Sequence, residues 1–398
     1  MARHFILAVV LALVTMIAST LHAAPLRPTD FVSLGPLPQG NVAIDTDALT
    51  FGGNPGGVLV VQGGGAPDIA VFTFDGGSAL DSGDSITVSG QNALAVLFQG
   101  SVVLSGTIDV SGGDGAAPIP RVITGVGGTG VAGGGRGGNG GPFSSLQDGA
   151  GPGGGSAGGS SASAGTVGSG AGGGFGTPGG NGGFGVTTRP GGVAYGDPLR
   201  ELLFAGSGGG GGGGQNVNNL GAGGGAGGGA LEIGALTTLE FAGATILANG
   251  GGGGDSADGV AAAAIGKDGG GGSGGGLLLH GHHVAIDAAT LIQANGGNGG
   301  FFQDLGGCGG AGRIEILHNT GGSLSNSGAV EAMSGAFGGE CTDGELVVTP
   351  SSEVGIPEPS TATLLVMGCA ALVNRRASRR IGPWAAAKEK SPKHFVAK

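Results

Sequence analysis

The residues best suited to bind a metal are three histidines within four positions, His280, His282 and His283. In an extended strand, His280 and His282 lie on one face, where two imidazoles can ligate zinc or copper. Zinc normally takes three or four ligands, and His318 is the further histidine that the sequence offers as a partner. The alternative is that these histidines form an exposed polar corner of the fold. Residues 234–237 take the equivalent place in the preceding sequence repeat. We therefore assign no metal site and no cofactor.

Two further motifs match known sites by composition alone. Residues 250–255 fit the start of a calcium-binding nonapeptide, whose ligands come from successive copies, but no tandem copy follows. Residues 154–158 and 271–275 fit the Gly-x-Ser-x-Gly pattern of a serine nucleophile, which requires a preceding strand, a following helix and Asp and His partners. Because the sequence lacks that context, we predict no catalytic residue and no enzymatic activity.

Glycine dominates the composition. It supplies 102 of 398 residues, against 15 Phe, one Tyr and one Trp. Collagen is excluded, because there is no strict three-residue period and there are only 18 Pro. The formal net charge is −11, and residues 24–374 carry 26 acidic and 7 basic side chains. This acidity disfavours nucleic acid as a partner, since Lys and Arg are needed to neutralise phosphates.

A repeat with an offset of 46 residues indicates the fold. The matching segments are 229–233 with 275–279 and 244–250 with 290–296, with looser copies at 94–112 and 313–335. Within one copy, apolar residues alternate at Leu231 and Ile233, at Leu239 and Phe241, and again near Ile246. This period of two predicts three short strands per copy. One copy cannot bury its own apolar face, so we expect the copies to stack as coils of a parallel β-helix.

Glycine-rich segments of about 24 residues separate the repeats, and the longest spans 125–229. They contain almost nothing apolar, and ordering Gly costs more backbone entropy than ordering any other residue. Closing a mobile loop of about 24 residues costs only about 3 kcal/mol. We therefore expect mobile loops, with stacked sheets of polyglycine as the alternative. Asn249 and Asn295 occupy equivalent places before Gly, and we expect them to form a ladder between stacked copies.

The expected fold class is all-β, with parallel β-helix or solenoid-like repeats, long Gly-rich loops and a short C-terminal hydrophobic helix. Residues 30–90 contain four apolar segments between Gly and Asp turns, which predict strands that cap the repeats or form their first coils. The expected divisions are a signal peptide (1–23), an N-terminal β region (24–120), a Gly-rich region (121–229), solenoid repeats (230–350), a sorting segment (354–380) and a basic cytoplasmic tail (381–398).

The N-terminal residues predict export. Arg3 and His4 precede an apolar stretch from Phe5 to Ala18, and small residues follow at Ala23 and Ala24. This is the layout of a secretory signal peptide, with cleavage near Ala23. A membrane-spanning anchor is the alternative, but the apolar stretch is shorter than the roughly 20 residues that a span requires.

The C-terminal region has three parts. Ile356-Pro357-Glu358-Pro359-Ser360 precedes an uncharged apolar run over 361–373, and four arginines follow, namely Arg375, Arg376, Arg379 and Arg380. This pattern resembles the PEP-CTERM sorting signal of bacterial proteins processed by exosortase. The resemblance implies export, transient anchoring at the inner membrane by a transmembrane helix, and transfer to the cell surface or extracellular matrix. The apolar run is short for a permanent span, and the positive-inside rule keeps the arginines cytoplasmic.

A buried C-terminal helix of a soluble domain is the alternative, but it does not explain the flanking prolines and arginines. The tail over 381–398 departs from the family, whose signals usually end the chain. The chain is also similar to Gly-rich β-solenoid surface proteins that carry such signals. The implied partners are an exosortase-type enzyme, the inner membrane and exopolysaccharide.

Three cysteines indicate one disulfide. Cys369 lies in the sorting segment, which leaves Cys308 and Cys341 in the exported part. An even number of cysteines in an oxidising compartment predicts a disulfide between them, with two free buried thiols as the alternative.

These inferences together predict a structural or adhesive component of the bacterial surface. The alternative is a cation- or glycan-binding surface module. A β-helix enzyme that degrades acidic polysaccharides is less favoured, because it needs clustered carboxylates beside Arg or Lys. The repeats instead offer scattered acids, at Glu232, Glu240, Asp287 and Glu315.

Overall fold

The computed structural model describes residues 25–119, 122–142, 146–159, 167–183, 188–196, 202–214, 220–256, 266–302, 305–337, 341–344 and 346–351. The chain divides into Met1–Gly355 and Ile356–Lys398, and every described residue belongs to the first unit. The predicted signal peptide, sorting segment and tail lie outside the described residues, together with Pro357, Glu358, Pro359, Arg375, Arg376, Arg379 and Arg380.

The described residues form strands, one 3-10 turn over Pro28–Asp30 and no α-helix. The prediction of an all-β protein is therefore confirmed. Within these ranges, no helix combines the length and apolar character that crossing a bilayer requires. The expected C-terminal hydrophobic helix falls outside them.

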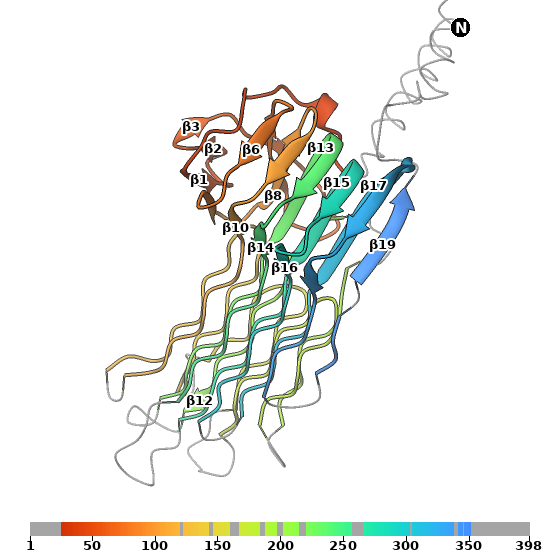
Figure 1. The fold of residues 1–398 in the computed structure, drawn as a ribbon. Coiled ribbons are helices and arrows are strands. Elements are labelled where there is room, and N and C mark those ends of the chain that lie inside the picture. The colour runs from red at the N-terminus through yellow and green to blue at the C-terminus, as the bar shows by residue number, and fades with distance from the viewer. Residues whose placement is uncertain are drawn as a thin grey trace, which may run out of the picture. The chain divides into compact units, whose positions relative to one another are not determined.

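Most strands belong to two sheets (Figure 1). The first has the order β18 (Ala329–Glu331), β16 (Leu291–Gln293), β14 (Thr245–Leu247), β10 (Thr107–Asp109), β7 (Ser85–Ser89), β1 (Asn41–Asp45), β2 (Thr50–Phe51) and β3 (Asn54–Pro55). The second has the order β19 (Leu346–Ser351), β17 (Arg313–Asn326), β15 (Gly276–Ile286), β13 (Ala230–Phe241), β8 (Ala93–Phe98), β5 (Ile69–Phe74) and β4 (Val58–Val60), with β9 (Val102–Leu104) pairing β13 and β6 (Ser78–Leu80) pairing β9. A separate pair joins β11 (Gly141–Pro142) and β12 (Gly213–Gly214).

The 46-residue offset is confirmed as a register of parallel strands. Leu231 of β13 pairs with Leu277 of β15, and Ile246 of β14 pairs with Ile292 of β16. The looser copies also join as parallel neighbours, β8 beside β13 and β17 beside β15. Each copy thus contributes strands to both sheets. Their inward apolar side chains form one buried cluster that draws from both sheets.

The three short strands predicted for each copy are present in the copy at 94–112, as β8, β9 and β10. In the next copy the first two are joined: β13 runs without a break through 12 residues, Ala230–Phe241, and only its register with β15 shifts between Ala235 and Thr238. The residues that link its two apolar bursts stay extended, and the two threonines among them favour a strand. The copies that contain β13, β15 and β17 therefore have one long strand in the second sheet and one short strand in the first.

The glycine-rich segments are ordered rather than mobile where the structure describes them. They appear in Figure 1 as long traces running side by side. Their backbone groups bond between segments: Gly209 N–H donates to Gly225 O at 2.8 Å, and Gly225 N–H donates to Gly270 O at 2.9 Å. The expectation of mobile loops is therefore wrong for these residues, because interstrand hydrogen bonds offset the entropy that ordering Gly costs.

The direction of these hydrogen bonds repeats every three residues. In the segment 220–229, which we call the central glycine strand, Ala222, Gly225 and Gly228 donate to residues 267, 270 and 273. The next residues along, Gly223 and Ala226, donate to residues 116 and 113, and the third set, Gly224 and Gly227, donates to residues 138 and 135. The N–H groups of this strand therefore bond three neighbouring segments, and its carbonyls accept from three more, at 206–212, 251–254 and 125–128. Three residues per turn is the period of polyproline II, which distinguishes this bundle from a flat polyglycine sheet.

Close packing explains why glycine fills the bundle. A Cβ at Gly225 would overlap the carbonyl oxygen of Gly251, and a Cβ at Gly272 would overlap that of Ala226. Collagen places Gly at its crowded axis for the same reason. Side chains are consequently confined to the few positions that face outward or fill gaps, and these positions make up the candidate site.

Candidate functional site

A polar ladder crosses the outer surface of the glycine bundle. Asn249 N–H donates to Ser111 Oγ at 3.1 Å, Asn295 N–H to Asn249 Oδ1 at 2.8 Å, and Met333 N–H to Asn295 Oδ1 at 2.7 Å. Each side chain thus caps the backbone of the next parallel segment. The predicted ladder of Asn249 and Asn295 is confirmed, and it extends beyond these two residues.

Parallel rows follow at three-residue steps. Asp114 Oδ1 accepts Gly252 N–H at 2.7 Å, Asn298 Oδ1 accepts Ala336 N–H at 2.7 Å, and Asp255 Oδ1 accepts Phe301 N–H at 2.8 Å. With about 3.1 Å of rise per residue in polyproline II, the rows stand roughly 9 Å apart. We call this array the polar face.

A shallow hollow of about 620 Å³ interrupts the polar face. Gly252 stands where a side chain would continue the row between Asp114 and Asn298, and a Cβ there would meet nothing closer than 3.5 Å. Asn249, Asn295 and Asp255 complete the polar lining. Amide groups and two exposed carboxylates can hydrogen-bond hydroxyl groups or attract a cation. Asp255, the residue singled out by the nonapeptide match, here contributes one carboxylate to the hollow.

Asn249 gives a test of the ladder. In Asn249→Ala, the Asn295 N–H loses its acceptor, and the Asn249 amide no longer donates to Gln293 Oε1, 3.3 Å away. We expect the free energy of unfolding to fall by about 0.5–1.5 kcal/mol, measured by guanidinium denaturation. Asn249→Asp keeps the Oδ1 acceptor and should lose less than half as much. Equal losses in the two variants would contradict the role given to Oδ1.

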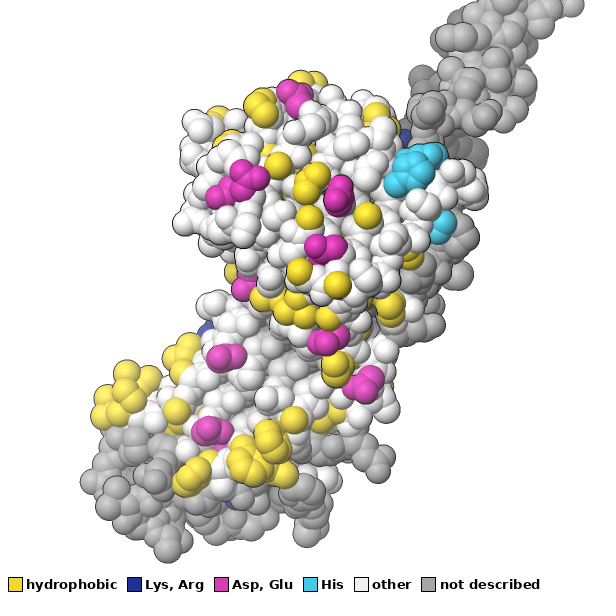
Figure 2. All heavy atoms as spheres, in the orientation of Figure 1, with side chains coloured by type: hydrophobic (Ala, Val, Ile, Leu, Met, Phe, Trp, Pro, Cys, Tyr) yellow, Lys and Arg dark blue, Asp and Glu magenta, His cyan; other side chains and the backbone are white. Residues whose placement is uncertain are grey.

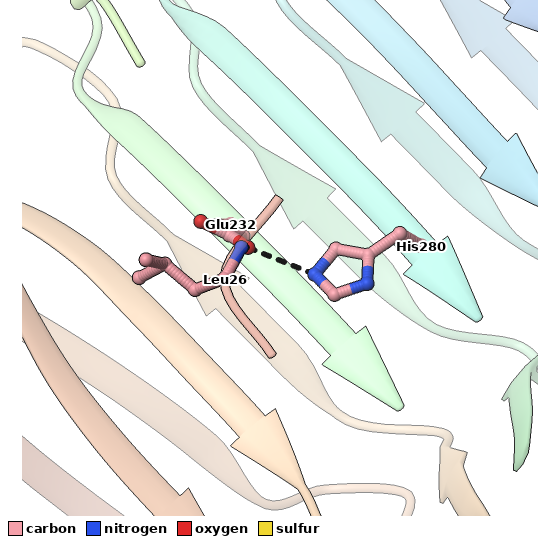
Figure 3. Close-up of polar contacts among 3 residues, drawn as sticks. All are labelled: Leu26, Glu232 and His280. Carbon is pink, nitrogen blue, oxygen red and sulfur yellow. Dashed lines mark hydrogen bonds and ion pairs between the residues drawn. The ribbon is translucent and has the colours of Figure 1, made fainter. Parts of the chain in front are cut away.

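His280 does not share an exposed face with His282. It is 2 % exposed and turned to the outer side of the second sheet, where its Nε2 lies 2.8 Å from Oε1 of the buried Glu232 (Figure 3). An ionised carboxylate only accepts hydrogen bonds, so Nε2–H is the donor when Glu232 is ionised. The register of β15 and β17 shifts between Gly281 and His283. This shift interrupts the regular alternation of side chains between the two faces of the strand, on which the prediction of a shared face depended.

His282, His283 and His318 contact other residues. The rings of His282 and His283 meet edge to face at 4.4 Å, and His283 Nδ1 lies 3.0 Å from Ser323 Oγ. His318 Nδ1 contacts the carbonyl of Asn319 at 3.1 Å. Histidines gather near one edge of the face in Figure 2, whereas acidic side chains lie singly over it. Across the described ranges, no group of three or more His, Cys, Asp or Glu is placed to hold a metal.

A third segment reaches the buried pair. The backbone N–H of Leu26 donates to Glu232 Oε1 at 2.6 Å, although 206 residues separate them (Figure 3). The Leu26 side chain packs in a second buried cluster, with Ile69, Ala95, Leu203, Ala230 and Leu278. The start of the described chain is therefore held against the outer side of the second sheet.

Gly234 makes room for the imidazole. It pairs directly with His280 across β13 and β15, and a Cβ there would overlap the ring. Sequence reasoning aligned Gly234 with His280 at the 46-residue offset but did not predict the pairing with Glu232. A glycine opposite a large side chain in adjacent repeats is the signal that could have found it.

The serine motifs are structural in the described residues. Ser273 is fully buried, and its Oγ accepts the N–H of Ser207 at 2.8 Å. Ser156 lies in the glycine bundle, beside Gly210. Neither serine stands on the strand-to-helix turn that a nucleophile elbow requires, since the described residues contain no α-helix.

Cys308 and Cys341 form a disulfide, with Cα atoms 6.4 Å apart, within the usual range for such bonds. The bond joins two glycine-rich segments, of which the one with Cys308 lies inside the bundle and is almost fully buried. Gly180 N–H donates to the Cys308 carbonyl at 2.8 Å. The disulfide therefore fastens the segment after β18 to the bundle.

No family model matches the chain, and neither a curated protein nor a solved structure matches it.

Proposed function

We propose that this chain is an exported bacterial protein that serves as a structural or adhesive component of the cell surface or its matrix. The motif at Pro357-Glu358-Pro359, the apolar run after it and the four arginines support sorting by an exosortase-type enzyme. The N-terminal residues support export by a cleaved signal peptide. In this proposal the protein is held transiently at the inner membrane and then released to the surface.

The observation that carries the structural role is the polar face on a bundle held by backbone hydrogen bonds. Close packing leaves little room for side chains inside the bundle, where Ser207 and Ser273 are buried, and the side chains of the polar face repeat on its outside at fixed steps. A regular array of amides and carboxylates complements a partner that also repeats, and exopolysaccharide is the partner of that kind that an exported surface protein meets. The acidic composition favours neutral glycans over anionic ones.

For the fold we propose a solenoid, in which each 46-residue copy is one layer. Parallel registers between β13 and β15 and between β14 and β16 support it, since both strands of one copy stack on both strands of the next. The glycine segments extend the same stacking beyond the sheets. Such stacking would give a rigid, repetitive surface, which suits a structural or adhesive role.

The sorting proposal has a direct test. Replacing Pro357, Glu358 and Pro359 by alanine should leave a larger, unprocessed form in the inner-membrane fraction of the native host, because exosortase recognition is lost. The matched control replaces Lys388, Glu389 and Lys390 by alanine, outside the motif. Unchanged processing and location of the alanine-motif variant would refute the proposal.

A cation- or glycan-binding module is the second candidate, favoured by the hollow that Asp114 and Asp255 line. Calorimetric titration of the exported chain with calcium and zinc separates the two. A heat of binding that is measured for the unaltered protein and lost in Asp114→Ala would favour the binding module. Absence of any heat of binding would contradict it. A panel of polysaccharides assayed for new reducing ends tests the enzymatic alternative.

A further inference from the structure

One buried carboxylate in the described structure is only half satisfied. Glu232 has no exposed surface. Its Oε1 accepts hydrogen bonds from Leu26 N–H and from His280, whereas its Oε2 is buried and has no hydrogen-bond partner among the described residues. Leaving such an oxygen without a partner inside a protein is costly. The arrangement therefore indicates a place for one more donor.

The segment that reaches Glu232 is the one that leads from the predicted cleavage site. Leu26 lies two residues after Ala24, which would be the first residue after cleavage at Ala23. Two residues of chain span at most about 7 Å, and Leu26 N is 2.6 Å from the same carboxylate. An amino group on Ala24 can therefore reach the second oxygen without moving Leu26.

We propose that Glu232 is the binding site for the α-ammonium group that signal-peptide cleavage creates at Ala24. This inference rests on the proposed export. Hydrolysis of the Ala23–Ala24 bond consumes one water, leaves a carboxylate on Ala23 and leaves an amine on Ala24, which takes up a proton to become an ammonium. In the uncleaved chain the same nitrogen is an uncharged amide. Cleavage thus supplies a positive charge beside a buried negative one.

The surroundings of Glu232 favour a charged donor of this kind. Glu232 is fully buried, and its cross-strand neighbours, Leu278 and Ala95, are apolar members of the second buried cluster, so the interaction is screened less than one at the surface. His280 contacts only Oε1. Charge-assisted hydrogen bonds to a carboxylate are about twice as strong as neutral ones. Signal-peptide cleavage would therefore hold the N-terminal segment more tightly against the second sheet.

The test compares two forms of the chain through Lys398, both produced in vitro. One begins at Ala24, released from a fusion whose protease leaves no extra residue, and the other carries one added glycine before Ala24. Each is treated with an amine-reactive reagent at pH 7, and labelling of the N-terminal peptide is followed by mass spectrometry. We expect the amine of Ala24 to react at least tenfold more slowly than that of the extended chain.

Two variants and one thermal measurement complete the design. Glu232→Gln in the Ala24 form should restore fast labelling, whereas Glu240→Gln, at an exposed position of the same strand, should not. If Glu232→Gln fails to fold, the midpoint of thermal unfolding still decides: the Ala24 form should melt higher than the extended form by on the order of 2–4 °C. Equal labelling rates and equal midpoints in the two forms would overturn the inference.

Failure of the inference and failure of the export proposal are separable. The N-terminal sequence of the protein recovered from the host reports cleavage by itself. An uncleaved chain counts against export, whereas a chain that starts at Ala24 but has a freely reactive amine counts against the Glu232 site alone.

Discussion

Gly225→Ala should destabilise the protein by at least about 2–3 kcal/mol. A Cβ at this position would overlap the carbonyl oxygen of Gly251 and crowd that of Gly252. The central glycine strand is hydrogen-bonded to neighbouring segments on all sides, so it cannot shift away from one without losing bonds to another. Thermal unfolding and guanidinium denaturation measure the loss.

Gly252→Ala is the matched control. The same methyl group there would meet only Asp114 Oδ1, at 3.5 Å, and Asn298 O, at 3.8 Å, which are ordinary contacts. Because Ala restricts the unfolded chain more than Gly does, this variant should gain about 0.4–1 kcal/mol. Similar small effects for both substitutions would contradict the packing that the structure assigns to Gly225.

Removing the disulfide should have a comparable effect. The bond between Cys308 and Cys341 joins residues 33 positions apart, and closing a loop of this length in the unfolded chain corresponds to about 3–4 kcal/mol in the chain-entropy account. We expect the double variant Cys308→Ser and Cys341→Ser to lose this amount, measured by guanidinium denaturation without reductant.

Addition of reductant to the unaltered protein should give the same loss and should change nothing further in the double variant. Cys369→Ser serves as the control for a cysteine outside the pair. A double variant as stable as the unaltered protein would show that the disulfide contributes nothing to the folded state.

The repeat was the part of the fold that the sequence predicted best. An offset of 46 residues aligned Leu231 with Leu277 and Ile246 with Ile292, and parallel strands pair these residues in the structure. Alternation of apolar side chains identifies which residues share a core. It does not say whether two bursts belong to one strand, so β13 was divided in two.

The glycine segments could not be predicted from local reasoning. Their stability comes from backbone hydrogen bonds between residues far apart in the chain, such as Gly227 with Gly135, and no side chain records these pairings. A signal was present nonetheless. Asn249, Gly252 and Asp255 match Asn295, Asn298 and Phe301 at the same offset, in steps of three, which is the period of polyproline II.

The sequence predicted one part of the candidate site and missed another. The ladder of Asn249 and Asn295 followed from their equivalent positions. His280 was assigned to a polar corner or a metal cluster, because strand periodicity says which side chains share a face but not which face is covered. The cover comes from Leu26, which lies more than 200 residues away in sequence and cannot be inferred from the strand itself.

Hydrogen–deuterium exchange of the glycine amides tests the central claim, that the glycine-rich segments are a backbone-bonded bundle. The decisive peptides cover residues 220–229 and 266–275, whose N–H groups donate between segments. The account predicts exchange slower than that of an unstructured peptide by on the order of a hundredfold or more, comparable to peptides from β13. Exchange of these glycines at the unstructured rate, with β13 still protected, would contradict it.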